Sequence, residues 1–155
     1  KLIDDGITAG TINALTLAAA PSASNIFDTV EKIADNVLTA NPALEGVSMN
    51  ICMAPSWIRS YFRDKRNTHG TDVNYSTTGI NTVDFVPNFK LVGLPSMEGT
   101  NYMFVTPGDN MVHLRKSNGM STPNVQLFDR QVKVLVDWYE GIGFLYNQLV
   151  FAYKP

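Results

Sequence analysis

The sequence predicts an α+β domain in which a mixed β-sheet is flanked by two main helices. Two stretches carry apolar residues at helical spacing, and several others alternate apolar and polar residues with the period of two that a half-buried strand requires. The length agrees with one domain, because a chain of 155 residues buries roughly two-thirds of the surface that its unfolded form exposes. We therefore expect residues 1–155 to form a single compact unit.

The first helix is predicted to follow an irregular N-terminal segment. The first 25 residues mix turn formers with short apolar pieces, so we expect no regular element there. Apolar residues then recur at helical spacing over 26–38. Ser24 or Asn25 is suited to cap this helix, and Pro42 predicts that it has ended by then.

A strand and a second helix are predicted next. Residues 47–53 alternate apolar and polar side chains, which indicates a half-buried strand. Pro55 then begins a helix that we expect to end near Asn67. One face of it carries aromatic residues, and another carries arginines at spacings of four and three: Arg59, Arg63 and Arg66.

The middle of the chain predicts a long loop and then an interrupted strand. Residues 67–82 are polar and show no periodicity, and loops of such length are usually functional or mobile. Residues 83–92 resemble a strand that is broken at Pro87. Proline cannot donate to the hydrogen-bond ladder, so this strand is expected at an edge or a bulge.

The last third of the chain predicts β-structure. Residues 102–105 and 111–115 read as two short strands joined by the turn at 107–110, which predicts a hairpin. The alternation over 132–136 and the apolar run over 149–153 predict two more strands.

Composition and charge exclude several classes of site. The 12 Lys and Arg nearly balance the 14 Asp and Glu, which argues against specific binding of a nucleic-acid sequence and against an anionic membrane as partner. Cys52 is the only cysteine, so no intramolecular disulfide forms. With only His69 and His113 beside it, Cys52 cannot complete a zinc site. We expect no metal and no cofactor.

Catalytic patterns are weak, and we expect no enzyme. Asp137 and Glu140 could form a carboxylate pair of the glycosidase kind, but the preceding period-two stretch favours solvent-facing charges. Gly141-Ile142-Gly143 lacks the third glycine of a dinucleotide fingerprint, because position 146 is Tyr146, and a bend in a strand is the better interpretation. Cys52 lies in a predicted strand, where a structural role is expected.

The order of these elements and several short motifs resemble a known family. The N-terminal Asp5-Gly6-Ile7 is followed by a helix, by a strand that leads through Met53-Ala54-Pro55-Ser56-Trp57 into a second helix, and later by Leu91-Val92-Gly93-Leu94-Pro95. This succession is similar to that in the Hong Kong 97 type of tailed-bacteriophage major capsid protein. The family commonly has Asn where this chain has Ala54.

The resemblance implies a Hong Kong 97-like capsid axial domain, with the C-terminal strands returning toward a peripheral domain. It also implies that Tyr102 to Arg115 form a displayed hairpin, and that the family's N-terminal arm and extended loop lie upstream. The start at Lys1 rather than Met agrees with a fragment or a processed product. The function implied is that of a phage or prophage major capsid subunit, which self-assembles into the icosahedral head shell that encloses the genome.

The implied partners are copies of the chain itself in hexamers and pentamers, with scaffolding or portal proteins as further partners. The implied location is the virion, and the host cytoplasm during assembly or expression from a prophage. The candidate subunit contacts lie on the second helix and the following loop: Arg59, Arg63, Arg66, His69, Asp72 and Tyr75.

Three alternatives stay open at this point. The arginine face could contact phosphates instead of a neighbouring subunit. The shell could be an encapsulin-like compartment rather than a virion. The chain could also be a small carbohydrate- or ligand-binding module, with an aromatic cleft built from Trp57, Trp138 and Tyr139.

Overall fold

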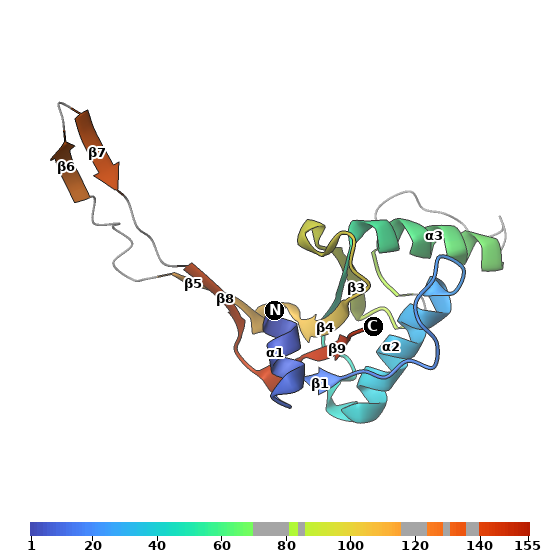
Figure 1. The fold of residues 1–155 in the computed structure, drawn as a ribbon. Coiled ribbons are helices and arrows are strands. Elements are labelled where there is room, and N and C mark those ends of the chain that lie inside the picture. The colour runs from blue at the N-terminus through green and yellow to red at the C-terminus, as the bar shows by residue number, and fades with distance from the viewer. Residues whose placement is uncertain (70–80, 84–85, 116–123, 129–130, 136–139) are drawn as a thin grey trace.

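The computed structural model describes residues 1–69, 81–83, 86–115, 124–128, 131–135 and 140–155. Its helices and main-sheet strands form the body of the molecule, and the other strands extend from that body (Figure 1). The body comprises α1 (Leu2–Thr8), α2 (Ile26–Ala40), α3 (Pro55–His69), β1 (Asn13–Ala14), β2 (Met49–Met53), β3 (Phe89–Gly93), β4 (Met103–Pro107) and β9 (Phe151–Tyr153). The remaining strands are β5 (Met111–Arg115), β6 (Asn124–Phe128), β7 (Gln131–Leu135) and β8 (Glu140–Phe144).

The main sheet is mixed, as the sequence predicted. Its strand order is β1-β9-β4-β2-β3, and β4 pairs antiparallel with both β2 and β9. The outer pairs, β1 with β9 and β2 with β3, are parallel. At the centre, Ile51 lies between Leu91 of β3 and Val105 of β4. The α+β class is therefore confirmed.

Helices cover both faces of the sheet. α2 and α3 pack on one face, where Met49, Ile51 and Met53 join the larger apolar cluster. Cys52 points to the other face and joins a smaller cluster, against which Ile3 and Ile7 of α1 pack. The prediction of a half-buried strand over 47–53 is thus wrong in its burial, because α1 covers the face that alternation alone assigns to solvent.

α2 and α3 are joined by a buried carboxylate. The N–H of Phe27, in the first turn of α2, donates to Oδ2 of Asp64 on α3 over 2.9 Å. Asn25 occupies the N-cap position of α2, as predicted, but its side chain accepts a hydrogen bond from the Ser22 N–H instead. A tertiary contact therefore satisfies a helix-terminal N–H that the local sequence leaves open. α3 ends at His69, two residues beyond the predicted end.

The N-terminal segment contains a helix, which corrects the prediction that it is irregular. α1 has few apolar positions, and the tertiary contacts of the segment hold it in place. Asp4 accepts hydrogen bonds from Tyr102 and Lys154, at 3.0 and 2.9 Å. Gly6 is required because a Cβ at this position would collide with the side chain of Ile12. The helix is thus specified by long-range partners rather than by its own pattern.

We expect the Asp4 contact to make stability depend on pH. The hydrogen bonds from Lys154 and then Tyr102 lower the pKa of Asp4 below its ordinary value of 3.8. A lowered folded-state pKa stabilises the fold above the unfolded value, and this contribution is lost as the pH falls through the folded value. The melting temperature of Asp4→Asn should therefore lie below that of the wild type at neutral pH. The difference should disappear below pH 3.8.

The control for this prediction is Asp5→Asn, on the exposed neighbour in the same helical turn. It should leave the melting temperature close to that of the wild type across the same pH range. Equal loss in both variants at neutral pH would contradict the assignment to the Lys154 contact, because both remove one charge near the helix N-terminus.

The predicted hairpin over 102–115 is wrong. β4 belongs to the main sheet, whereas β5 leaves the body and pairs with β8. Between them, residues 108–110 form a single 3₁₀ turn. The buried Asn110 side chain donates to Thr106 Oγ1 and to the Tyr146 carbonyl, and it accepts from the Tyr146 N–H. These bonds direct the chain away from β4 instead of reversing it.

The interrupted strand over 83–92 is also a reversal rather than one broken strand. Pro87 lies in a turn that precedes β3, and Thr82 forms an isolated antiparallel bridge with Lys90. β3 stands at the edge of the sheet, so the predicted edge location is confirmed. Most of the predicted loop over 67–82 lies outside the described residues.

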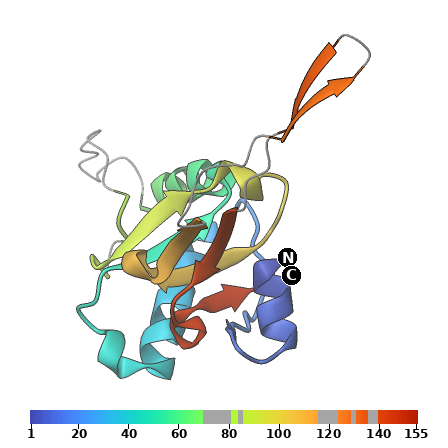
Figure 2. The ribbon, with the colours of Figure 1, turned by 90° about the vertical axis from the view of Figure 1, so that its left-hand side faces the viewer.

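The remaining strands form an arm. The β5–β8 ribbon extends from the body, and the β6–β7 hairpin lies beyond its far end in both views (Figures 1 and 2). β7 and β9 confirm the strands predicted over 132–136 and 149–153, although 147–149 form a 3₁₀ turn. Within the described ranges, each helix is too short or too polar to cross a bilayer.

Candidate assembly surfaces

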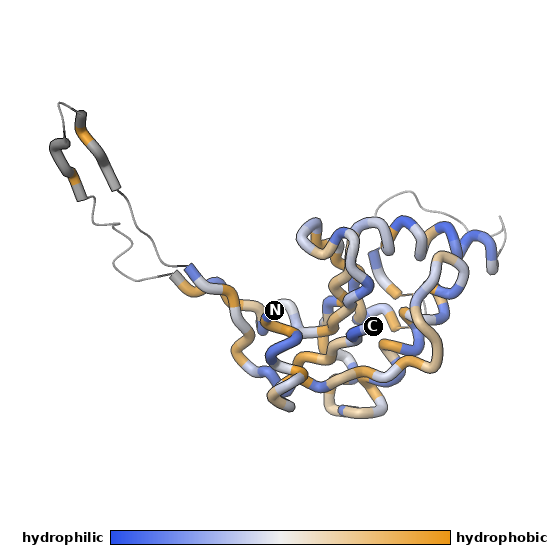
Figure 3. Tube along the Cα trace, in the orientation of Figure 1, coloured by the Kyte–Doolittle hydropathy of each residue, from blue (hydrophilic) through white to orange (hydrophobic). Residues whose placement is uncertain are grey.

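The arginine face of α3 is exposed, as the sequence predicted. Arg59, Arg63 and Arg66 are exposed, and the trace of α3 carries several strongly hydrophilic stretches in Figure 3. Arg59 Nη2 lies 4.0 Å from Glu98 Oε1, and the other oxygen of Glu98 accepts the Ser56 N–H at 3.3 Å. Glu98 therefore sits at the N-terminus of α3, where a carboxylate is favoured by the helix dipole.

The other predicted contacts are described only in part. His69 is the last residue of α3, and Asp72 and Tyr75 lie outside the described residues. The structure therefore places the three arginines on one helix face and does not place the rest of the predicted set.

The predicted aromatic cleft is likewise described only through Trp57. The indole Nε1 of Trp57 donates to the Thr100 carbonyl over 3.2 Å, and the ring packs against the larger apolar cluster. Trp138 and Tyr139 lie outside the described residues. Trp57 thus holds the connection between β3 and β4 against α3.

The arm carries most of the exposed apolar surface of the described residues. Eight large hydrophobic side chains are exposed among the described residues, and six of them lie on the arm or at its base. Ile142 is the most exposed, at 75%. Single exposed apolar side chains are ordinary, but a concentration of them marks an interaction surface. The six are Leu114, Val125, Val132, Ile142, Leu145 and Tyr146.

The total surface agrees with an unpartnered arm. The chain exposes 10303 Å², whereas a compact monomer of 17.1 kDa exposes about 7,800 Å². The surplus of about 2,500 Å² exceeds the roughly 800 Å² per partner of a standard protein–protein interface. The surface is therefore large enough for more than one such contact.

Two glycines leave the β8 half of one face of the β5–β8 ribbon without side chains. Gly141 pairs with Leu114, and Gly143 pairs with Val112. Neither glycine has a positive φ, and a Cβ at Gly143 would meet nothing within 4 Å. The fold therefore does not require glycine at these two positions, and glycine in a strand often marks a close approach by another chain. The segment lies in a strand, as predicted.

An apolar groove lies between α1 and the base of the arm. Its volume is about 480 Å³. Its wall includes Asp4 and Tyr102, which are already hydrogen-bonded to each other. The larger share of its lining is apolar and comes from α1, the β3–β4 connection, β4 and β8: Leu2, Ile3, Leu94, Met97, Phe104, Ile142 and Phe144.

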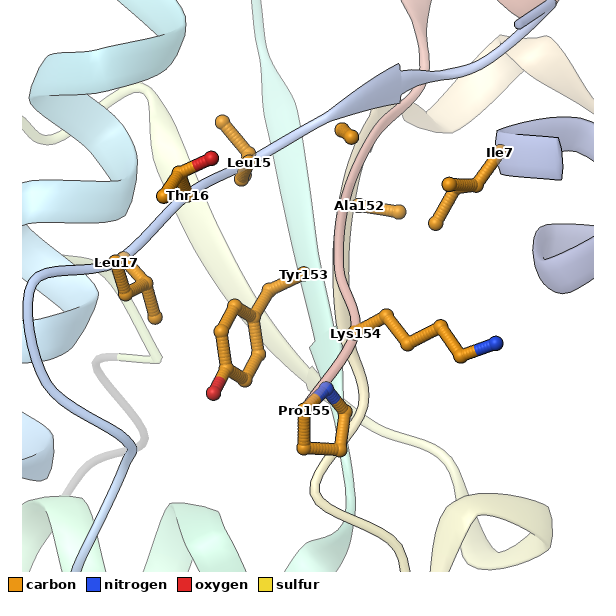
Figure 4. Close-up of a pocket in the computed structure, with 9 residues that line it drawn as sticks. Ile7, Leu15, Thr16, Leu17, Ala152, Tyr153, Lys154 and Pro155 are labelled. Atoms are coloured by element: carbon orange, nitrogen blue, oxygen red, sulfur yellow. The ribbon is translucent and has the colours of Figure 1, made fainter.

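A second hollow of about 410 Å³ surrounds the end of β9 (Figure 4). Tyr153 and Leu17 lie on one side of the strand, and Lys154 and Ile7 lie on the other. The Lys154 ammonium is bound to Asp4 rather than directed at an empty site. Because the strand divides this hollow, polar groups do not converge in it as they do in a ligand site.

Cys52 has the environment of a structural thiol. Its side chain is fully buried in β2, and burial raises the pKa of the thiol to about 12. A thiol is reactive as the thiolate, so a thiol-specific reagent at neutral pH should not label the native protein. The same reagent should label Cys52 fully in concentrated guanidinium, followed by the absorbance of the released chromophore. Rapid full labelling of the native protein would contradict this prediction.

The predicted carboxylate pair is described only through Glu140. Oε2 of Glu140 lies 3.5 Å from Nε2 of His113 across the β5–β8 ribbon, and both side chains are largely exposed. Asp137 lies outside the described residues. In the described part of the chain, no three His, Cys, Asp or Glu residues gather closely enough to hold a metal ion.

The sequence predictions missed the arm as a surface. The signal was present in the alternation of β6 and β7, which pair as Val125 with Val134 and Leu127 with Val132. This register places Val125 and Val132 on one face of the hairpin. Only the pairing shows that the two stretches share a face away from the core.

Comparison with known proteins shows the fold. A chain from Mycobacterium phage Che8 matches with a TM-score of 0.60 at 13% identity, over 93% of this chain and 53% of that one. A chain of the virus-like particle from Pyrococcus furiosus matches with a TM-score of 0.52 at 8% identity, over 99% of this chain and 59% of that one. No family model and no curated protein matches. The chain thus spans little more than half of each solved chain.

Proposed function

We propose that this chain is a structural subunit that assembles with copies of itself into a protein shell, in the first place the capsid of a phage or prophage. The observation that carries the proposal is the arm, because six of the eight exposed large hydrophobic side chains among the described residues lie on it or at its base. Such a surface is costly for a lone soluble molecule and is useful for a subunit.

The fold supports the same proposal. The two similar solved chains belong to a phage and to a virus-like particle. The role requires no catalytic group. On this proposal the chain is the Hong Kong 97-like axial domain with part of a peripheral domain. Its partners are then copies in hexamers and pentamers, with scaffolding or portal proteins beside them, in the host cytoplasm during assembly and then in the virion.

Repeated contacts give such a subunit its stability. In a closed ring each modest interface is made many times, so weak contacts add to a stable assembly. The arginine face of α3 suits a neighbouring acidic surface, because guanidinium pairs with carboxylate through two parallel hydrogen bonds. Arg59, Arg63 and Arg66 are therefore proposed to act at the rim of the contact between neighbours.

The test is expression of the gene product alone, followed by light scattering and negative-stain electron microscopy. The expected result is rings, tubes or closed shells. A strictly monodisperse monomer at high protein concentration would overturn the proposal and would favour the ligand-binding alternative.

A second candidate is the shell of an encapsulin-like compartment. The likeness to a virus-like particle favours it. The contents of shells purified from the native source separate the two functions, since a virion shell encloses nucleic acid and a compartment encloses protein. Nuclease treatment with gel analysis of both components gives the answer.

A further inference from the structure

We infer that the β6–β7 hairpin of one copy docks in the groove between α1 and the arm base of a second copy. This inference rests on the proposed function and identifies the two surfaces that meet. In the proposed contact, the apolar face of the β6–β7 hairpin of one copy lies in the apolar groove at the base of the arm of the other copy.

The projecting partner is one face of the hairpin. Val125 and Val132 are 59% and 62% exposed. Val125 pairs with Val134, and Val132 pairs with Leu127. Val125 and Val132 are therefore diagonal neighbours on the same face of the hairpin. The hairpin therefore presents an aliphatic patch that has no cover in the described part of the molecule.

The receiving partner is the groove. Leu2 is 46% exposed in its wall, and Ile142 stands at its rim on β8. Met97 and Phe144 also line it. Two of its polar lining residues, Asp4 and Tyr102, are hydrogen-bonded to each other, and Asp4 is also bound to Lys154. An aliphatic occupant would thus cover these half-exposed polar groups while they keep their partners, which a docking surface requires.

The occupant is a second copy because the geometry separates the two surfaces within one chain. Ile142 and Phe144 place the groove at the base of the β5–β8 ribbon, and the hairpin lies beyond the far end of that ribbon (Figures 1 and 2). The surplus surface of about 2,500 Å² exceeds the roughly 1,600 Å² that two standard contacts need on each copy, one given and one received. A contact that joins different surfaces repeats from copy to copy and closes a ring when the rotation allows it.

Site-directed crosslinking tests the inference in the full chain. Val132→Cys places a thiol on the hairpin, and Ser96→Cys places one on an exposed wall of the groove. Cys52 is buried, so it does not compete for a short bismaleimide crosslinker. The matched control replaces Ser96→Cys with Thr39→Cys, on the exposed side of α2 across the sheet.

A mixture of Val132→Cys and Ser96→Cys should give a covalent dimer several-fold above the mixture of Val132→Cys with Thr39→Cys. Crosslinks no stronger than the control would overturn the inference. Stronger crosslinking within Val132→Cys alone would also overturn it, because the hairpins would then meet tip to tip.

A second pair of variants measures the apolar contact itself. Val132→Asp should abolish assembly, whereas Val132→Ile should preserve it, with both monomers folded by circular dichroism. Assembly that survives Val132→Asp overturns the docking but leaves the proposed shell function standing. A wild-type chain that stays monomeric removes the proposed function and the docking with it.

Discussion

Replacing Tyr61 by alanine is expected to lower the free energy of unfolding by about 3–5 kcal/mol. Tyr61 is fully buried where α3 meets α2, with its ring centroid 5.5 Å from that of Phe27 and 5.5 Å from that of Phe62. Removing the ring opens a cavity between two helices, and Asp64, whose buried carboxylate accepts the Phe27 N–H, lies one turn away on the same helix. If the helices moved together to fill the cavity, they would disturb that hydrogen bond. We therefore expect the cavity to stay largely open, which keeps the loss of stability large.

Urea unfolding of dilute, unassembled protein measures this effect. The matched control is Arg63→Ala on the exposed face of the same helix, which should change the free energy of unfolding by no more than about 0.5 kcal/mol. The melting temperature should fall by about 2–4 °C for each kcal/mol lost. A Tyr61→Ala loss as small as that of Arg63→Ala would show that the α2–α3 contact does not stabilise the body.

The sequence predicted those elements whose pattern is local. α2 and α3 have long apolar faces and clear boundaries, and β2 has a period of two, so their type and approximate bounds were correct. α1 was missed because its seven residues are too few for a stable isolated helix. Its contacts with Ile12, Tyr102 and Lys154 lie elsewhere in the chain.

The start of the arm was predicted wrongly although its local signal was clear. The turn over 107–110 has hairpin residues, and turn chemistry favours pairing of the strands on either side. Two kinds of competing contact prevent this pairing. β4 is already paired with β2 and β9, and Asn110 is bound to Tyr146, 36 positions away. Such pairings over long separations carry no local signal in a single sequence.

The candidate assembly surfaces also divide into one that local sequence spacing predicts and others that it does not. The arginine face was predicted because spacings of four and three residues place side chains together on a helix. The apolar arm and the groove were not, because each is built from segments that meet only in the fold. Leu2 and Ile142, for example, line one groove from opposite ends of the chain.

Asn110 should be the second position of large effect, because it joins the body to the arm. Its side chain is buried and makes three hydrogen bonds of 2.8–2.9 Å, one to Thr106 in the main sheet and two to the backbone of Tyr146. Asn110→Ala leaves the Tyr146 N–H and carbonyl without these partners. We expect the free energy of unfolding to fall by about 1–3 kcal/mol, because the buried Thr106 hydroxyl also loses its partner and an unsatisfied buried polar group is costly.

The consequence for assembly should be larger than the loss of stability, because the same bonds set the direction of β5 and β8. At a temperature where Asn110→Ala is still folded by circular dichroism, its light scattering should stay at the monomer level while the wild type assembles. Asp109→Ala, at the exposed neighbouring position, should assemble like the wild type. If Asn110→Ala assembles normally despite its lower stability, the arm is held by other contacts. In that case its orientation is not what limits the joining of copies.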